Sequence, residues 1–209
     1  MITRTLRVRA AEVDPPALEE AAGVLRRGGL VAFATETFYG LGANALDREA
    51  IQRIYAVKGR PEEKPLLVLV DSARMARPLV EDIPTIAWRL MTRYWPGPLT
   101  LVFRASSKVP DALTAGTGTI GIRMPGHPVA LGLVQAAGVP VTAPSANPEG
   151  GEPPTTADEV ERYFDGKIEL ILDSGPTRGG LPSTMVDVTA TPARLLRKGV
   201  LELPELEPR

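Results

Sequence analysis

The sequence predicts a fold of the α/β or α+β class, in a single domain built around one main sheet. Helix-type and strand-type patterns alternate along the whole chain, which is typical of this class. The chain has 209 residues, 44% of them hydrophobic, which is enough to bury a substantial core without disulfides. It contains no internal repeat and no linker long enough to separate two domains. We therefore expect one domain over residues 1–209.

Start and stop signals locate the helices. Asp14 can cap a helix that continues over residues 17–27, because two prolines suit its first turn and two glycines follow its end. Asp47 can cap a second helix that ends with Lys58. Further helices are predicted over residues 84–94, 128–137 and 156–164, the last opened by the capping box Thr156-Ala-Asp-Glu159.

Short apolar runs between these helices predict the strands. They cover residues 30–34, 66–70, 99–103, 119–123, 139–143, 168–172, 184–188 and 194–197. The longest irregular stretch, residues 144–154, follows directly on one of these runs and is rich in proline and glycine. Loops at strand ends are common places for a functional site, so this segment is a candidate.

Composition excludes several classes of function. The chain has no cysteine and a single histidine, His127, which excludes disulfides, thiolate chemistry and mechanisms that need several imidazoles. We expect His127 to be structural. The 24 basic and 25 acidic residues give a formal net charge of −1, which argues against a dedicated nucleic-acid binder but allows a local basic cleft.

No stretch of about 20 apolar residues is present, so we expect no membrane span. The amino-terminal segment lacks the apolar core of a signal peptide, and we expect a cytoplasmic enzyme. The phosphate-binding patterns G-x-x-x-x-G-K-[ST] and G-x-G-x-x-G are missing, as is the nucleophile pattern G-x-S-x-G. Any bound phosphate must therefore be held by scattered cationic and hydroxyl side chains.

Two segments combine the residue types that such a site needs. Lys58 and Arg60 stand at a helix end around a glycine, where a point charge and a planar fork suit a polyphosphate. Taken alone, the pair could equally complement the helix C-terminus. Ser145 and Asn147 offer a hydroxyl and an amide on one turn, although a simple Asx or Ser turn explains the same pattern.

Similar polar residues occur at other strand ends. Thr35 opens a hydroxyl-rich turn after a predicted strand, and Arg123 ends another strand, where its cation could meet a carboxylate or simply face solvent. Ser183 and Arg197 repeat the combination of a hydroxyl and a cation at element ends.

Together these segments resemble one family, the threonylcarbamoyl-AMP synthases of the YrdC/Sua5 type. The matching segments are Thr35-Glu-Thr-Phe-Tyr-Gly-Leu41, Lys58-Gly-Arg60-Pro61, Arg123-Met-Pro-Gly-His-Pro128, Pro144-Ser-Ala-Asn147, Ser183-Thr-Met-Val-Asp187 and Leu196-Arg-Lys-Gly199. They occur in the family's order over roughly residues 16–200, and the paired K-x-R and S-x-N signatures are specific.

The resemblance implies an open, twisted mixed sheet flanked by helices, with a concave cationic cleft. It implies synthesis of L-threonylcarbamoyladenylate and pyrophosphate from L-threonine, bicarbonate or CO2, and ATP with Mg²⁺. The product would supply threonylcarbamoylation of adenosine in tRNA by separate transferase proteins, with a possible contact to RNA. The chain resembles the short YrdC type, without the additional C-terminal domain of the Sua5 type.

The resemblance also assigns roles to residues. Lys58 and Arg60 would be catalytic and bind the ATP phosphates. The rest of the ATP site would comprise Thr119, Ala143 and Arg197. L-Threonine would be bound by Thr35, Arg123, Ser145 and Ser183, with Arg123 meeting its carboxylate. Ser145 and Asn147 would lie at the junction of the two substrates and take part in catalysis.

Two positions depart from the family pattern. Leu69 stands where some members have histidine, and Pro153 stands where others offer a serine to the nucleotide, so both contacts are in doubt.

Two other functions stay open. One is a carbamoyl-adenylate-forming module like that of hydrogenase-maturation proteins, and the other is a double-stranded RNA-binding module.

Overall fold

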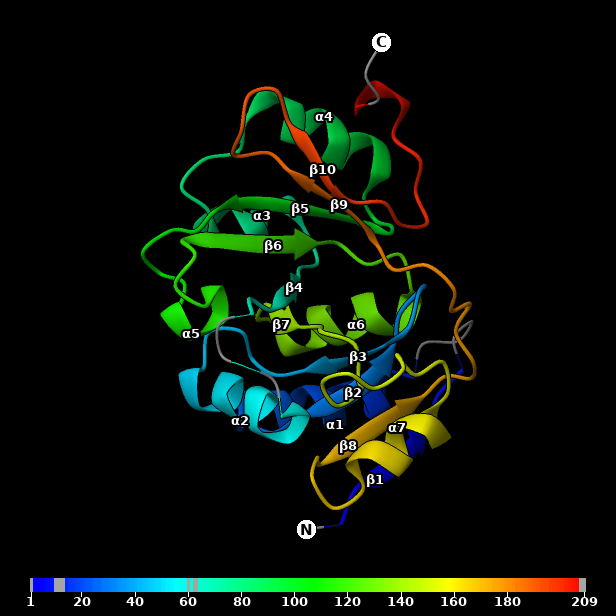
Figure 1. Cartoon of the computed structure of the whole chain (residues 1–209). Helices are drawn as coiled ribbons and strands as arrows, with labels where there is room; N and C mark the ends of the chain where they lie inside the picture. Colours follow the sequence, from blue (N-terminus) through cyan, green and yellow to red (C-terminus); the bar gives the residue numbers. More distant parts are fainter. Residues whose placement is uncertain (1, 10–13, 60, 62–63, 207–209) are drawn as a thin grey trace.

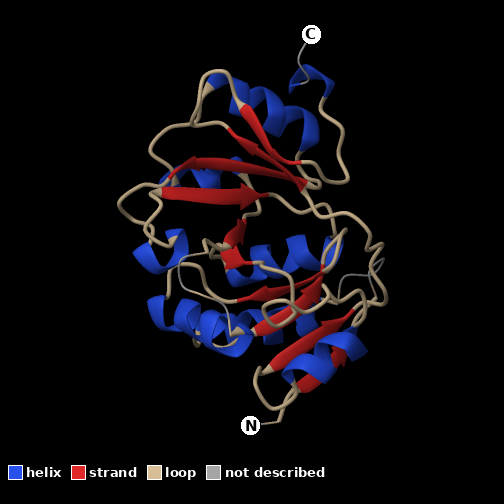
Figure 2. Ribbon diagram, in the orientation of Figure 1, coloured by secondary structure: helices blue, strands red, loops and turns tan. Residues whose placement is uncertain are grey.

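The computed structural model describes residues 2–9, 14–59, 61 and 64–206 of the 209. Its strands form two mixed sheets, one above the other in Figure 1, with helices packed against them (Figures 1 and 2). The expectation of a single main sheet was therefore wrong, whereas the mixed α/β class with flanking helices is confirmed.

The four-stranded sheet has the order β1-β8-β2-β3. Its strands are β1 (Arg4–Arg7), β8 (Leu170–Asp173), β2 (Val31–Ala34) and β3 (Tyr39–Gly42). β8 runs parallel to both β1 and β2, and β2 pairs antiparallel with β3. β2 and β3 are buried at every position, since helices and the second sheet cover their two faces.

The six-stranded sheet has the order β10-β9-β5-β6-β4-β7. Its strands are β10 (Arg194–Arg197), β9 (Thr184–Asp187), β5 (Leu99–Arg104), β6 (Thr119–Arg123), β4 (Leu67–Leu69) and β7 (Val141–Thr142). β9 runs parallel to β5 and β4 runs parallel to β6, while the other pairs are antiparallel. The predicted strand over residues 139–143 is reduced to the two residues of β7, and Val141 also forms an isolated bridge with Asn44.

Helices cover the outer faces of the sheets. They are α1 (Pro15–Arg26), α2 (Arg48–Lys58), α3 (Ala73–Ala76), α4 (Thr85–Tyr94), α5 (Asp111–Thr114), α6 (Pro128–Ala137) and α7 (Ala157–Phe164), with two 3-10 turns at Arg77–Leu79 and Pro204–Leu206. The predicted caps are confirmed. Asp14 and Asp47 accept hydrogen bonds from the first turns of their helices, and Thr156 and Glu159 form the capping box.

The two sheets meet along β3 and the segment around β7. The Thr142 hydroxyl accepts a hydrogen bond from the Ala43 N–H at 2.9 Å and donates to the Leu41 carbonyl at 3.1 Å. Thr142 N–H also donates to the Ala43 carbonyl at 2.9 Å. Side-chain hydrogen bonds and isolated backbone contacts, in place of a regular ladder, therefore join the two sheets here.

Strands β1 and β3 were not predicted. β3 contains two glycines that suggested a turn, but a side chain at Gly42 would lie 2.8 Å from the Phe33 ring and 2.9 Å from Val141. The glycine is therefore needed for close packing inside a strand. Within the described part of the chain, no helix combines the length and apolarity needed to cross a membrane.

Candidate active site

A cleft of about 620 Å³ lies where the two sheets face each other. Its lining comes from the β2–β3 turn, from strand ends of the six-stranded sheet and from the loops after β7 and before β9. The lining residues are Thr35, Thr37, Phe38, Tyr39, Gly40, Pro65, Leu67, Arg123, Ala143, Pro144, Ser145, Glu152, Pro153, Gly180, Pro182, Ser183, Met185 and Arg197.

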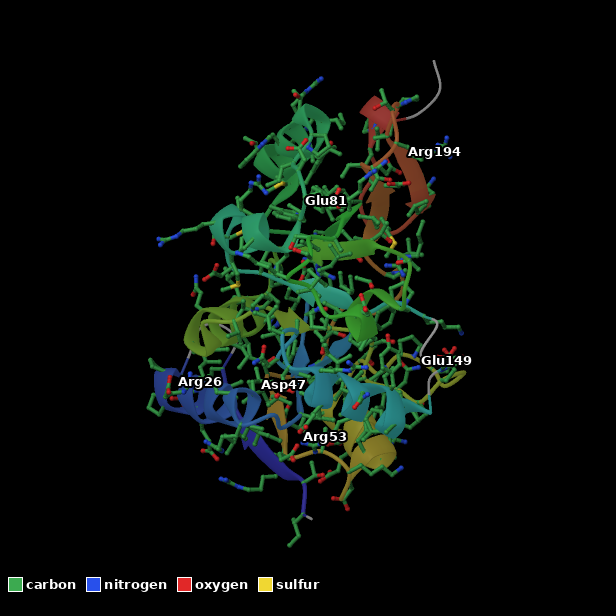
Figure 3. All side chains as sticks on the ribbon, turned by 90° about the vertical axis from the view of Figure 1, so that its left-hand side faces the viewer. Arg26, Asp47, Arg53, Glu81, Glu149 and Arg194 are labelled. Carbon is green, nitrogen blue, oxygen red and sulfur yellow. The ribbon has the colours of Figure 1, made fainter. Side chains whose placement is uncertain are left out.

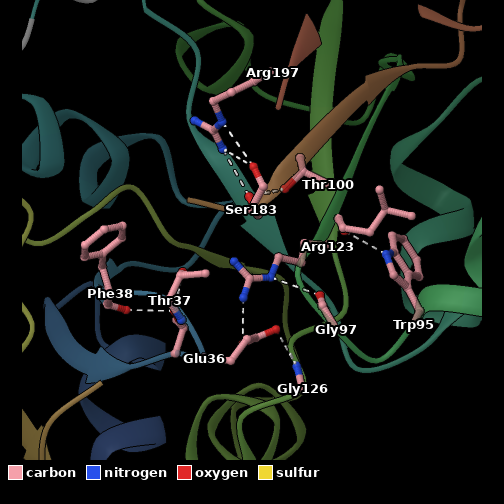
Figure 4. Close-up of polar contacts among 12 residues, drawn as sticks. Glu36, Thr37, Phe38, Trp95, Gly97, Thr100, Arg123, Gly126, Ser183 and Arg197 are labelled. Atoms are coloured by element: carbon pink, nitrogen blue, oxygen red, sulfur yellow. Dashed lines mark hydrogen bonds and ion pairs between the residues drawn. The ribbon is translucent and has the colours of Figure 1, made fainter. Parts of the chain in front are cut away.

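Arg123 stands at the end of β6 and reaches this cleft, although only 3% of its side chain is exposed. Its Nε donates to the Gly97 carbonyl at 3.2 Å, and its Nη2 lies 2.6 Å from Glu36 Oε2 (Figure 4). That contact is a close ion pair, but the two atoms do not meet the geometry of a hydrogen bond. The guanidinium is thus held at two of its three nitrogens.

Glu36 is held from a second direction, since its Oε1 accepts the Gly126 N–H at 3.0 Å. Burial alone would raise the pKa of the Glu36 carboxyl. The charge of Arg123, its close side-chain contact and the hydrogen bond from the Gly126 N–H oppose burial, and the pKa lies below its ordinary value. Glu36 is therefore an anion behind Arg123 at neutral pH.

Ser183 and Arg197 form a second polar cluster on the cleft wall. Arg197 donates twice to the Ser183 carbonyl, from Nε at 3.1 Å and from Nη2 at 3.0 Å, and Nη2 also lies 3.1 Å from the Ser183 hydroxyl. The same hydroxyl lies 2.9 Å from the Thr100 hydroxyl (Figure 4). Burial of the guanidinium and the nearby charge of Arg123 lower the pKa of Arg197, even though the residue as a whole is exposed.

Thr35 lies at the end of β2, with only 4% of the residue exposed. Its hydroxyl contacts the Phe38 carbonyl at 2.7 Å and the Thr37 hydroxyl at 3.0 Å, and it accepts the Thr37 N–H at 3.2 Å. These bonds close the turn between β2 and β3 and place both threonines on the cleft wall.

Lys58 ends α2 and is 3% exposed. Its ammonium donates to the Ser145 carbonyl at 2.6 Å and to the Asn147 carbonyl by a short contact. Lys58 therefore supports the S-x-N turn from behind, and Ser145 of that turn lines the cleft. Asn147 Nδ2 donates to the Pro148 and Gly151 carbonyls, and its buried Oδ1 has no hydrogen-bond partner among the described residues.

The remaining predicted residues divide between the cleft and other places. Ala143 and Pro153 line the cleft, whereas Leu69 is fully buried in the core. Thr119 lies at the far end of β6 from Arg123, with its hydroxyl 3.0 Å from that of Thr117, and is not part of the cleft lining. Arg60 falls outside the described residues, so its predicted phosphate contact stays a prediction.

Two residues in or next to the cleft, the half-buried Glu36 and the buried Tyr39, were missed by sequence reasoning. Glu36 was read only as part of the T-E-T turn, yet it pairs with the central arginine. Tyr39 lines the cleft, and its hydroxyl donates to the Gly175 carbonyl at 2.8 Å. Burial and the charge of Asp173 raise the pKa of Tyr39, so it stays neutral. For Glu36, the available signal was a glutamate between two threonines at the end of a predicted strand.

Comparisons with known proteins show which family this chain resembles in sequence and structure. A family model described as Sua5_yciO_yrdC, Telomere recombination, matches residues 23–199. Threonylcarbamoyl-AMP synthase of Pyrococcus abyssi is 50% identical over 187 residues, which cover 90% of this chain and 55% of the relative. A putative threonylcarbamoyl-AMP synthase of Mycobacterium tuberculosis is 35% identical and covers 95% of this chain and 91% of the relative.

Solved structures agree. P. abyssi Sua5 complexed with L-threonine superposes with a TM-score of 0.92 at 46% identity, over 98% of this chain and 59% of that one. E. coli YciO has a TM-score of 0.89 at 24% identity, over 99% and 100% of the two chains, and shows the shared fold. The chain spans about half the length of the curated relatives that match with 40 to 50% identity. On these matches, the chain belongs to the Sua5/YciO/YrdC family.

Proposed function

We propose that this protein is an L-threonylcarbamoyladenylate synthase, a nucleotidyltransferase that uses L-threonine, bicarbonate or CO2, and ATP. The observation that carries the proposal is the pair of guanidinium groups on one cleft. Arg123 and Arg197 both line it, and burial together with the smaller effect of the Arg123 charge lowers the pKa of Arg197. Two cations that repel each other across a cleft favour a bound anion between them.

The substrates match the chemistry of the lining. Arg123 suits the threonine carboxylate, because its guanidinium presents a planar donor fork. Thr35 and Ser183 also line the cleft, and their hydroxyls suit the polar groups of the amino acid. The P. abyssi relative that binds L-threonine in its structure supports this assignment. Arg197 and Ser145 would face the nucleotide, Arg60 would meet its phosphates, and Lys58 would hold the turn that carries Ser145 from behind.

The reaction needs no nucleophile from the protein. The threonine amine adds to CO2 and loses a proton, which gives a carbamate. A carbamate oxygen then attacks the α-phosphorus of ATP, and the bond from that phosphorus to the β-phosphate oxygen breaks, releasing pyrophosphate. Positioning and neutralisation of phosphate charge are the main means of accelerating such a step. Arginine, lysine and hydroxyl groups around one cleft can supply both.

Mg²⁺ would arrive with ATP and help to neutralise the triphosphate. Among the described residues, no group of three or more His, Cys, Asp or Glu side chains could hold a metal ion by itself. Glu152 lines the cleft and could add one carboxylate oxygen to an ion that is held mainly by phosphate and water oxygens. The product is a reactive mixed anhydride, so we expect a separate tRNA-modifying transferase to consume it.

The test is release of pyrophosphate from ATP and Mg²⁺, with bicarbonate and L-threonine each omitted in turn. We expect release only when both are present. Release that does not need threonine would overturn the proposal, as would its absence from the complete mixture. A parallel reaction with carbamoyl phosphate in place of threonine and bicarbonate tests the carbamoyl-adenylate alternative, which predicts release there instead.

A further inference from the structure

We infer that Glu36 is a positioning residue for L-threonine, because it fixes the orientation in which Arg123 meets the substrate carboxylate. The inference rests on the proposed function and extends it to a residue that does not itself line the cleft. Glu36 lies behind Arg123, and only Arg123 of the two is part of the lining. It would therefore act through the arginine and not by contact with the substrate.

The guanidinium is held at two of its nitrogens. Nη2 faces Glu36 Oε2 at 2.6 Å and Nε faces the Gly97 carbonyl at 3.2 Å. Because a guanidinium is planar, two such contacts set both the plane and the rotation of the whole group. The part of the fork that reaches the cleft is thereby aimed before any substrate arrives.

Glu36 is itself fixed by the backbone on both sides. It belongs to the β2–β3 turn, which the Thr35 hydroxyl closes, and its Oε1 accepts the Gly126 N–H at 3.0 Å from the loop after β6. The carboxylate thus ties a turn of the four-stranded sheet to the strand end that carries Arg123 (Figure 4). A 1 Å displacement of such a group can change a rate about a hundredfold.

Replacement by glutamine separates orientation from charge. In E36Q, one rotamer of the amide turns its NH₂ group toward Arg123, and the other turns it toward the Gly126 N–H. In each rotamer two donors face each other, so either Arg123 or the Gly126 N–H loses its acceptor, and the side chain no longer links the arginine to the loop after β6. If charge alone mattered, the same substitution would strengthen threonine binding, because a competing anion is removed from the arginine.

The chain offers a matched control in Glu169. Its Oε1 lies 2.8 Å from Arg53 Nη2, its Oε2 accepts the Leu30 N–H at 2.7 Å, and Arg53 Nη1 donates to the Gly28 carbonyl at 2.8 Å. Arg53, labelled in Figure 3, belongs to α2, and neither Arg53 nor Glu169 is part of the cleft lining. E169Q removes a similarly bonded, more exposed ion pair outside the cleft lining.

The experiment measures threonine affinity by calorimetry and the KM values for threonine and ATP in the unsubstituted protein, E36Q and E169Q. We expect E36Q to weaken threonine binding about tenfold or more, with the KM for ATP changed less than about twofold and E169Q close to the unsubstituted protein. Equal or tighter threonine binding by E36Q would overturn the positioning role. An equal loss of affinity for both substrates would do the same.

E36D guards against a variant that fails to fold, since it keeps the charge but shortens the reach. We expect its threonine affinity to fall about threefold or more, and an unchanged affinity would overturn the inference. If the unsubstituted protein binds no threonine, the proposed function fails and this inference falls with it. The two failures are therefore distinguishable.

Discussion

Replacement of Lys58 by methionine tests the two roles that its position allows. The ammonium is 3% exposed and bonds the Ser145 and Asn147 carbonyls. If it supports the S-x-N turn, its removal leaves two carbonyl groups without this donor, at a cost of about 1–3 kcal/mol each. Part of that cost is offset because a buried charge no longer has to be desolvated. We expect a net loss of about 3 kcal/mol in the free energy of unfolding.

Urea unfolding without ligands measures this loss directly, because no ATP is present for Lys58 to bind. For a domain of this size the loss corresponds to a fall in Tm of about 6–12 °C. Lys64→Met is the control, since it removes a lysine from the exposed ion pair with Glu149, and such pairs contribute about 0–1 kcal/mol. A Lys58→Met protein that is as stable as the unsubstituted protein, yet inactive, would refute the support role and leave phosphate binding as the role of Lys58.

Three further predictions concern contacts that join separate segments of the fold, at Glu36, Thr142 and Gly199. Because the folded-state pKa of Glu36 is lowered, its contribution to stability is present above about pH 4.5 and lost below it. The stability difference between the unsubstituted protein and E36Q, from urea unfolding, should therefore shrink as the pH falls below about 4, and a constant difference would contradict this. Thr142→Val should cost about 1–3 kcal/mol, because the Ala43 N–H and Leu41 carbonyl lose a partner between the sheets; a change below about 0.5 kcal/mol in the same assay would contradict it. Gly199→Ala would place its Cβ 2.2 Å from the Pro182 carbonyl, so both Tm and pyrophosphate release should fall, and a normal Tm would show that the loop yields freely.

Local signals in the sequence were sufficient for much of the fold. The caps at Asp14, Asp47 and Thr156 act within a few residues, and the helices begin where these caps predict. Strand β3 was not predicted, because Gly42 packs against Phe33 and Val141 and no local sequence pattern indicates such a contact. The division into two sheets depends on pairings between distant segments, which alternation along the chain does not encode.

The site divides in the same way. Polar residues at strand ends drew attention to Thr35, Arg123, Ser183 and Arg197, and the fold brings all four to one cleft. What sequence could not supply is the network behind them. Burial of Lys58 under the S-x-N turn depends on tertiary contacts between residues about ninety positions apart.

The most direct test of the proposed activity follows the carbon of bicarbonate. ¹³C-bicarbonate, L-threonine and Mg-ATP would be incubated with the protein, and the adenylate product identified by mass spectrometry and ³¹P NMR. We predict one AMP-linked product that carries both the ¹³C label and threonine, formed in step with pyrophosphate. Pyrophosphate without labelled adenylate, or an adenylate that lacks the bicarbonate carbon, would contradict the account.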